Sequence, residues 1–252
     1  MGIKDRRTKI LLSLLLMSND QFRFISYDKT ILSVFDLTLN RKTLSTIQKL
    51  EKEGLIEGQE DNKTSENPSY RLTEAGFKSV TLNFPFFRFT REKWDQIFRI
   101  LSYEIPEKKR ELRDKLRREV SSWGLGPWHR SFWLTPHPII PSLKELVSKK
   151  AEEQYIQAFE SQHSFGDKDI LIEKVWGKSK LENTYRKLFK KWHEILSKDQ
   201  EKDKKMALVV AQYVDVLKID PGLPKDLVGD KWIGYEAINL FREIRNILLN
   251  TK

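Results

Sequence analysis

The sequence contains no cysteine, and this absence excludes disulfide bonds, thiolate metal sites and a cysteine nucleophile. It fits a reducing compartment, so we expect a cytoplasmic protein. The four histidines, His129, His137, His163 and His193, show no metal-ligand spacing. A glycine-rich phosphate loop, a nucleophile elbow and a paired-acid motif are missing as well. We therefore predict a protein that is not an enzyme and that needs no cofactor.

Long hydrophobic runs are also missing. The run from Ile10 to Met17 is far too short to span a bilayer, and no small-residue cleavage site of a signal peptide follows it. We expect no membrane partner. A helix over residues 6–18 would have no solvent-exposed polar face, because this run is apolar on too many sides. Such a helix must be covered on several sides, either as the central helix of a domain or, in part, as a dimer contact.

The chain does have length and positive charge. Its 252 residues exceed the common size of one domain, so we expect two or three domains. The net charge of +10 favours an anionic partner, but the surplus is spread along the chain and forms no basic arm. Charge alone gives only weak support for nucleic-acid binding.

The stretch from Asn40 to Gly76 predicts a recognition helix followed by a β-wing. Leu44, Ile47 and Leu50 recur at helical spacing and predict the buried face of the helix, which Gly54 ends. The opposite face is one of hydrogen-bond donors. The donors on this face are Arg41, Lys42, Ser45, Thr46 and Lys49. We expect them to contact DNA; the alternative is an ordinary solvated helix face.

The surrounding residues complete the pattern. Residues 28–37 predict a positioning helix, Ile56 begins one wing strand, residues 70–72 form the other, and Thr73 can cap the next helix. The wing tip, residues 60–67, has three acids against one lysine, so the helix must make most of any DNA contact. This order of elements resembles a winged helix-turn-helix, whose second helix enters the major groove.

The rest of the chain predicts a second and a third domain. Four phenylalanines around Pro85 suggest an extended linker that docks on a neighbouring domain. A strand, a helix and a strand then predict half of an α/β sandwich. The predicted strands cover residues 97–105, 129–135 and 154–161, the helix between the first two covers residues 106–123, and further helices cover residues 181–192, 206–217 and 234–249.

Two features of the predicted sandwich leave alternatives open. The helix after Pro106 interleaves seven cations with four acids, which indicates a solvated face first and an anion-binding surface second. Trp128, Arg130 and Trp133 lie close together and could hold an effector. Strand alternation directs Trp128 and Arg130 to one face and Trp133 to the other, so at least one tryptophan is expected in the core.

Nearly the whole chain resembles the PaaX family of bacterial transcriptional regulators. The likeness lies in LEKEGLIEG with YRLTEAG, in YEIPEKKRELRDKLRREVSSWGLGPWHRSFWLTP, and in the C-terminal WGKSKLENTYRKLFKKW and DPGLPKDLVGDKWIGYEAINLF. It implies an α+β multidomain protein with a ferredoxin-like central domain and a helical C-terminal domain. We expect a winged domain over residues 1–82, an aromatic linker over 83–93, the central domain over 94–175 and the C-terminal domain over 176–252.

The resemblance also implies a function. Members are repressors that dimerise, bind a double-stranded operator, and release it when an effector such as an aromatic acyl-coenzyme A binds. A homodimer with two recognition helices predicts an inverted-repeat operator.

One departure concerns the related CRISPR adaptation nucleases, in which an aspartate ends the first strand of a similar domain. Here Glu104 occupies that place, without a second acidic ligand nearby in the sequence. Since a divalent ion normally keeps several oxygen ligands, a metal-dependent nuclease or adaptation scaffold is an alternative only. A protein-interaction module is the other alternative, because the wing tip is acidic.

Overall fold

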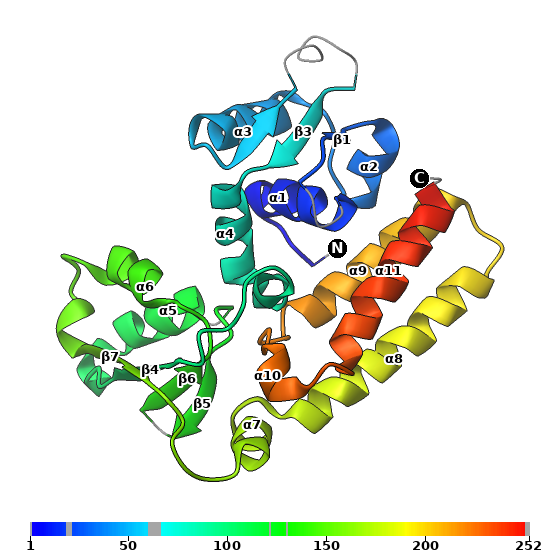
Figure 1. Cartoon of the computed structure of the whole chain (residues 1–252). Coiled ribbons are helices and arrows are strands. Elements are labelled where there is room, and N and C mark those ends of the chain that lie inside the picture. Colours follow the sequence, from blue (N-terminus) through cyan, green and yellow to red (C-terminus); the bar gives the residue numbers. More distant parts are fainter. Residues whose placement is uncertain (1, 19–21, 60–66, 121, 130, 250–252) are drawn as a thin grey trace. The chain divides into compact units, whose positions relative to one another are not determined.

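The computed structural model describes residues 2–18, 22–59, 67–120, 122–129 and 131–249 (Figure 1). It is an α+β structure with helices and two small antiparallel sheets, as predicted. Its contacts group into two compact units, and each combines segments that are distant in the sequence. Unit 1 comprises Met1–Thr81, Thr184–Leu217 and Ile233–Lys252, and unit 2 comprises Leu82–Asn183 and Lys218–Trp232. The predicted segments follow the order of the chain, whereas the contacts join its first and last parts in one unit.

The N-terminal part of unit 1 has the order helix, strand, helix, helix, strand, strand, helix. The sequence did not predict the two-residue strand Ile25–Ser26 between the first two helices. Its sheet has the order β1-β3-β2, with both strand pairs antiparallel. β2 and β3 form the hairpin in which Ile56 lies opposite Leu72. The elements are α1 (Arg6–Met17), β1 (Ile25–Ser26), α2 (Lys29–Val34), α3 (Arg41–Lys52), β2 (Ile56–Gly58), β3 (Ser69–Leu72) and α4 (Glu74–Asn83).

α1 is the central helix of unit 1. All its residues from Lys9 to Met17 are buried within the chain, and both α3 and β3 pack against it. The guanidinium of Arg245 closes its C-terminal end, where it donates hydrogen bonds to the carbonyl oxygens of Leu16, Met17 and Ser18 over 2.9, 3.0 and 3.1 Å. These are carbonyls that a helix end leaves unpaired. α1 therefore has no free apolar face.

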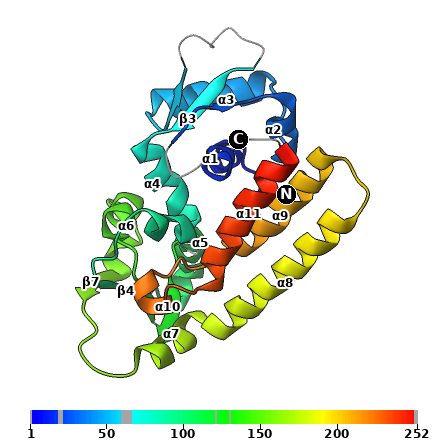
Figure 2. The same cartoon turned by 45° about the vertical axis from the view of Figure 1, so that its right-hand side comes forward.

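The last helices of the chain complete unit 1 (Figure 2). α9 (Lys202–Leu217) lies against both α2 and α11 (Ile233–Leu249), and α8 (Lys178–Ser197) enters the unit from Thr184 onward. Trp192 of α8 packs edge-on against Tyr213 with ring centroids 5.5 Å apart, and Phe241 lies 5.0 Å from Tyr213. All three rings of this cluster are buried.

Unit 2 contains a four-stranded antiparallel sheet with the order β5-β6-β4-β7. Its elements run strand, helix, strand, strand, helix, strand, so by chain order the sheet reads 2-3-1-4. This is the ferredoxin-like arrangement that was predicted. The elements are β4 (Phe98–Tyr103), α5 (Arg110–Val120), β5 (Gly126–His129), β6 (Phe132–Thr135), α6 (Ile140–Val147) and β7 (Ile156–Ser161), with η2 (Pro85–Thr90), η3 (Glu107–Lys109), η4 (Glu153–Tyr155), α7 (Lys168–Trp176) and α10 (Lys225–Val228) around them.

The structure corrects two local predictions in unit 2. The predicted single strand over residues 129–135 is a hairpin of β5 and β6, with a bulge between Pro127 and His129. The alternating pattern of the sequence runs from one strand into the other, so the pattern does not reveal the reversal. The linker after Phe84 is the 3-10 helix η2, not an extended strand, because proline fixes a φ suited to a first helical turn. Phe84, Phe86 and Phe87 are buried.

The segment 218–232 is attached to the sheet of unit 2 through a buried histidine. The ring Nε2 of His137 is 2.7 Å from the carbonyl oxygen of Pro221, and Phe89 stacks on the ring at 4.8 Å. Burial lowers the pKa of His137 to about 3, so it is neutral and donates this hydrogen bond. Gly222 has a φ of +64°, and a Cβ there would meet the main chain of Pro85 at 2.3 Å. Only glycine fits this approach.

Candidate nucleic-acid interface and ligand pocket

α3 is held in place by its cap and by the turn before it. The side chain of Asn40 accepts a hydrogen bond from the main-chain N–H of Thr43 over 3.0 Å, which starts the helix. Asp36, with a φ of 54°, forms the turn after α2. The buried Lys9 of α1 donates to its carboxylate over 2.6 Å and to its carbonyl oxygen over 3.0 Å. This hydrogen bond lowers the pKa of Asp36 and ties the turn to α1.

The buried face of α3 differs from the predicted one by one position. Thr43, Ile47 and Leu50 are buried, whereas Leu44 is 38% exposed. At 3.6 residues per turn, positions 43, 47 and 50 lie within an arc of about 60°, and positions 44, 47 and 50 spread over about 120°. The prediction that Leu44 is buried was therefore wrong, because a narrower arc that includes a threonine was available.

The predicted DNA-contact residues do share the opposite face. Arg41, Lys42, Ser45 and Lys49 are exposed, and no carboxylate in the described part of the chain pairs with the three cations. Thr46 is half-buried, and its hydroxyl donates to the carbonyl oxygen of Lys42 over 2.8 Å. Gln48, which was not among the predicted contacts, is exposed on the same helix. Its amide is a base-reading group that residue type alone could have indicated.

The wing strands follow α3 directly. The hydroxyl of Thr73 donates to the carbonyl oxygen of Gly54 over 2.6 Å and accepts from the main-chain N–H of Gly76 over 3.0 Å, which is the predicted cap of α4. Glu57 and Arg71 pair across the strands at 2.7 Å. The acidic wing tip lies outside the described residues, apart from its last residue.

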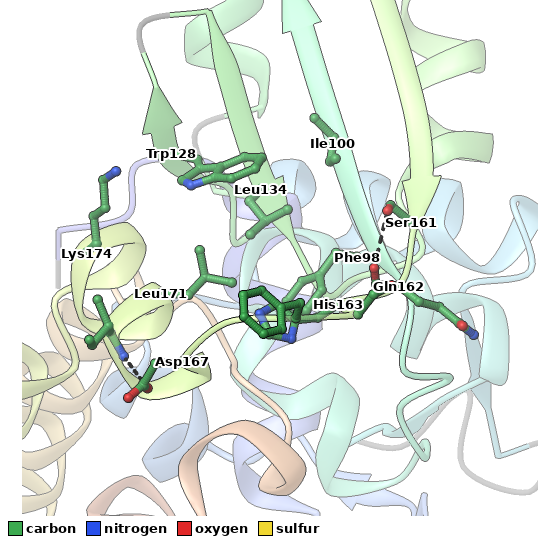
Figure 3. Close-up of a pocket in the computed structure, with 13 residues that line it drawn as sticks. Phe98, Ile100, Trp128, Leu134, Ser161, Gln162, His163, Asp167, Leu171 and Lys174 are labelled. Atoms are coloured by element: carbon green, nitrogen blue, oxygen red, sulfur yellow. Dashed lines mark hydrogen bonds between the residues drawn. The ribbon is translucent and has the colours of Figure 1, made fainter.

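A pocket of about 520 Å³ lies on the sheet face that is turned away from α5 and α6 (Figure 3). Phe98, Ile100 and Leu134 form its floor, and Trp128 forms one wall at 42% exposure. Further lining comes from the loop after β7 and from α7, including His163, Phe165, Ile170, Leu171 and Lys174. These residues were not predicted as site residues, because the sequence pattern did not indicate α7.

The three candidate effector residues do not form one cluster in the described structure. Trp133 lies on the other sheet face, where it packs beside Tyr103 with ring centroids 6.4 Å apart and beneath the guanidinium of Arg117 at 5.7 Å. Arg130 lies outside the described residues. Of the two described candidates, Trp128 lines the pocket on the sheet face turned away from α5 and α6.

Metal chemistry has little support in the described structure. Glu104 is exposed after β4, and its main-chain N–H donates to the carbonyl oxygen of Tyr155 over 3.1 Å. The described residues contain no group of three histidines or acids placed to hold a metal ion. They also contain no helix with the length and apolarity needed to cross a membrane.

Comparison with known proteins gives two family matches that follow each other along the chain. The model described as "PaaX protein central Cas2-like domain" matches residues 91–171, and "PaaX-like protein C-terminal domain" matches residues 176–251. No curated protein matches. Among solved structures, the uncharacterized protein Rv0674 from Mycobacterium tuberculosis is similar in fold over 96% of this chain and 94% of its own, with a TM-score of 0.53 and 14% identity. The chain belongs to the PaaX family.

Proposed function

We propose that this protein is a sequence-specific transcriptional repressor that inserts α3 into the major groove of DNA. Family membership suggests a PaaX-like transcriptional regulator, and the surface of α3 supports the finer assignment. Arg41, Lys42, Ser45 and Lys49 present donors on one exposed face, and no described carboxylate neutralises the cations. Such a face offers both base-reading and phosphate-binding groups. This is the observation on which the proposal rests.

The repressor acts as a homodimer on an inverted repeat. Two recognition helices in successive major grooves require half-sites about 34 Å apart. The sheet face of unit 2 turned away from α5 and α6 supports this part of the proposal, because Phe132 and Phe159 are 39% and 51% exposed on it. Both lie on the face opposite α5 and α6, as their strand partners Ser102 and Ile100 do. A second copy would remove these rings from water.

A small-molecule effector, acyl-coenzyme A-like, releases the DNA. The pocket beside Trp128 supports this part, since its walls are mainly apolar and the ammonium of Lys174 lies at its edge. An indole wall suits the acyl group, and a cation suits a phosphate. Titration of the protein with an aromatic acyl-coenzyme A tests the assignment. The Trp128→Ala variant should lose the binding signal, whereas Trp133→Ala should keep it.

The direct test of the function uses a labelled duplex from the region upstream of the protein's own gene. Binding is measured with competitor DNA, across a salt series, with and without magnesium. The proposal predicts saturable, sequence-selective binding without cleavage. Magnesium-dependent cleavage that Glu104→Ala abolishes would favour a nuclease, and binding indifferent to sequence would favour a protein-interaction module.

A further inference from the structure

We propose that Leu44 contacts the 5-methyl group of a thymine and so determines base preference at one position of each half-site. This inference rests on the proposed function of α3. It assigns a base-reading role to a residue that the sequence pattern placed in the core.

The exposure of Leu44 is unusual for its part of the molecule. Among the described residues of 1–81, the exposed large apolar side chains are Leu39 and Leu44, at 37% and 38%. Both lie at the N-terminal end of α3, one immediately before the cap Asn40 and the other in the first turns of the helix. The core position that Leu44 would fill is taken by Thr43, which is fully buried.

A purely structural role must be weighed first. Leu39 and Leu44 occupy the positions before the cap and four residues after it, where apolar side chains often pack together as a hydrophobic staple. A staple explains why both residues are apolar. However, more than a third of the Leu44 surface remains exposed to solvent. This exposed part of the side chain can make a further contact.

The position of Leu44 fits base reading in the major groove. The N-terminal residues of a recognition helix are the ones that reach base edges. Leu44 lies there among Arg41, Lys42 and Ser45, all exposed. The side chains of these neighbours can form hydrogen bonds with phosphates or with base edges. A leucine side chain can form no hydrogen bond. The complement to an apolar side chain in the major groove is the thymine methyl group.

The test removes each partner of the proposed contact in turn: the 5-methyl group from the DNA, and the leucine side chain from the protein. Full-length protein selects its preferred duplex from a random-sequence library, and each thymine of that duplex is then replaced by uracil, which lacks only the 5-methyl group. At one thymine position per half-site, the wild-type protein should bind the uracil duplex about fourfold more weakly, which is the ratio for about 0.8 kcal/mol per methyl group buried. Leu44→Ala should bind both duplexes equally at that position.

Two variants serve as matched controls. Leu39→Ala removes the apolar side chain at the other staple position, and Leu208→Ala truncates a leucine of similar exposure, 41%, on α9. Both should keep the discrimination between thymine and uracil, even if Leu39→Ala lowers the melting temperature as much as Leu44→Ala does. Thymine discrimination that survives in Leu44→Ala, or that disappears equally in Leu39→Ala, would overturn the assignment while the repressor function stands. Failure to select any preferred duplex would instead overturn the proposed function, and with it this inference.

Discussion

α3 and α5 are two basic amphipathic helices whose cations differ in their surroundings. In α5, Arg113 pairs with Glu107 at 2.8 Å and Lys115 with the buried Glu152 at 3.3 Å. Arg110 lies 3.5 Å from Asp114 in the next turn. In α3, the exposed cations Arg41, Lys42 and Lys49 have no such partner among the described residues. The number of cations on a helix therefore says less about binding than the number left without a counter-charge.

The comparison also accounts for the two alternatives left open for α5. Its acids are contributed by the helix itself, by the segment just before it and by Glu152, the residue before η4, so much of its charge is balanced within unit 2. That arrangement favours a solvated, ion-paired face. The ion pairs distinguish α5 from α3 more clearly than the sequence does. The partner of Lys115, Glu152, lies 37 residues further along the chain, where a local pattern does not reveal it.

The largest expected effect comes from exchanging an arginine for alanine on each helix. If Arg41 reads a guanine edge, Arg41→Ala should cost roughly 1 to 3 kcal/mol of operator binding and relax specificity at one base pair. Arg113→Ala on α5 should leave affinity and specificity unchanged. Both are measured by fluorescence anisotropy with the selected duplex and its single-position variants. Equal losses in the two variants would mean that α3 is not distinguished from α5.

A smaller effect is expected for the lysines. Lys49→Ala should weaken binding to all sequences alike and reduce the slope of log K against log salt by about 0.9, the value for one phosphate contact. Lys115→Ala should leave the slope as it is, because this lysine faces Glu152. The measurement is the affinity at a series of salt concentrations. An unchanged slope in Lys49→Ala would show that Lys49 does not contact a phosphate.

The ion pair that positions α3 should contribute to stability in a pH-dependent way. Asp36→Asn keeps the shape and the left-handed turn but removes the charge facing Lys9, and it should cost up to about 1 kcal/mol of unfolding free energy, as the carboxylate is largely exposed. The folded-state pKa of Asp36 is lowered, so its contribution is complete above the unfolded-state pKa of about 3.9 and is lost as pH falls through the folded-state value.

Chemical denaturation at several pH values checks this prediction. The difference between wild type and Asp36→Asn should be constant near neutral pH and vanish in acid. Glu107→Gln, which breaks the pair with Arg113 on α5, should cost less, because both groups lie at a solvated surface. A larger loss in Glu107→Gln would contradict the view that the α3 turn is the more tightly held of the two.

The smallest effect concerns Thr46. Its hydroxyl already donates to the carbonyl oxygen of Lys42, so Thr46→Val should change operator binding by no more than about 0.5 kcal/mol. Ser45→Ala, on the exposed face, should weaken binding more. Competition binding against the wild type decides between them. A larger loss in Thr46→Val would make Thr46 a direct DNA contact.

Local patterns in the sequence predicted those parts of the fold that depend on neighbours along the chain. The helix over Arg41–Lys52, the cap of α4, the wing strands and the helices α8, α9 and α11 follow from periodicity and capping residues. The buried face of α3 shows the limit of this approach. Thr43 is buried where Leu44 was predicted, and a shift of one position moves a side chain from the core to the surface. The ferredoxin-like order came from the resemblance to a family.

Long-range contacts were beyond the reach of the pattern. Arg245 caps α1 from 227 residues away, and His137 binds Pro221 from 84 residues away. Neither contact has a local signature, because an arginine within a helix and a histidine after a strand are common in many settings. The pocket likewise depends on contacts between distant parts of the chain. Trp128 was predicted as a candidate ligand-binding residue, but α7, which also lines the pocket, was not predicted.

The most direct test of the central claim is the affinity of full-length protein for a duplex that it has itself selected, compared with a scrambled duplex, for wild type and for Arg41→Ala. The account predicts clear selectivity in the wild type, on the order of 10³-fold or more, and a reduced ratio in the variant. Equal affinity of the wild type for both duplexes, or a ratio that Arg41→Ala leaves unchanged, would contradict the assignment of α3 as the helix that reads DNA.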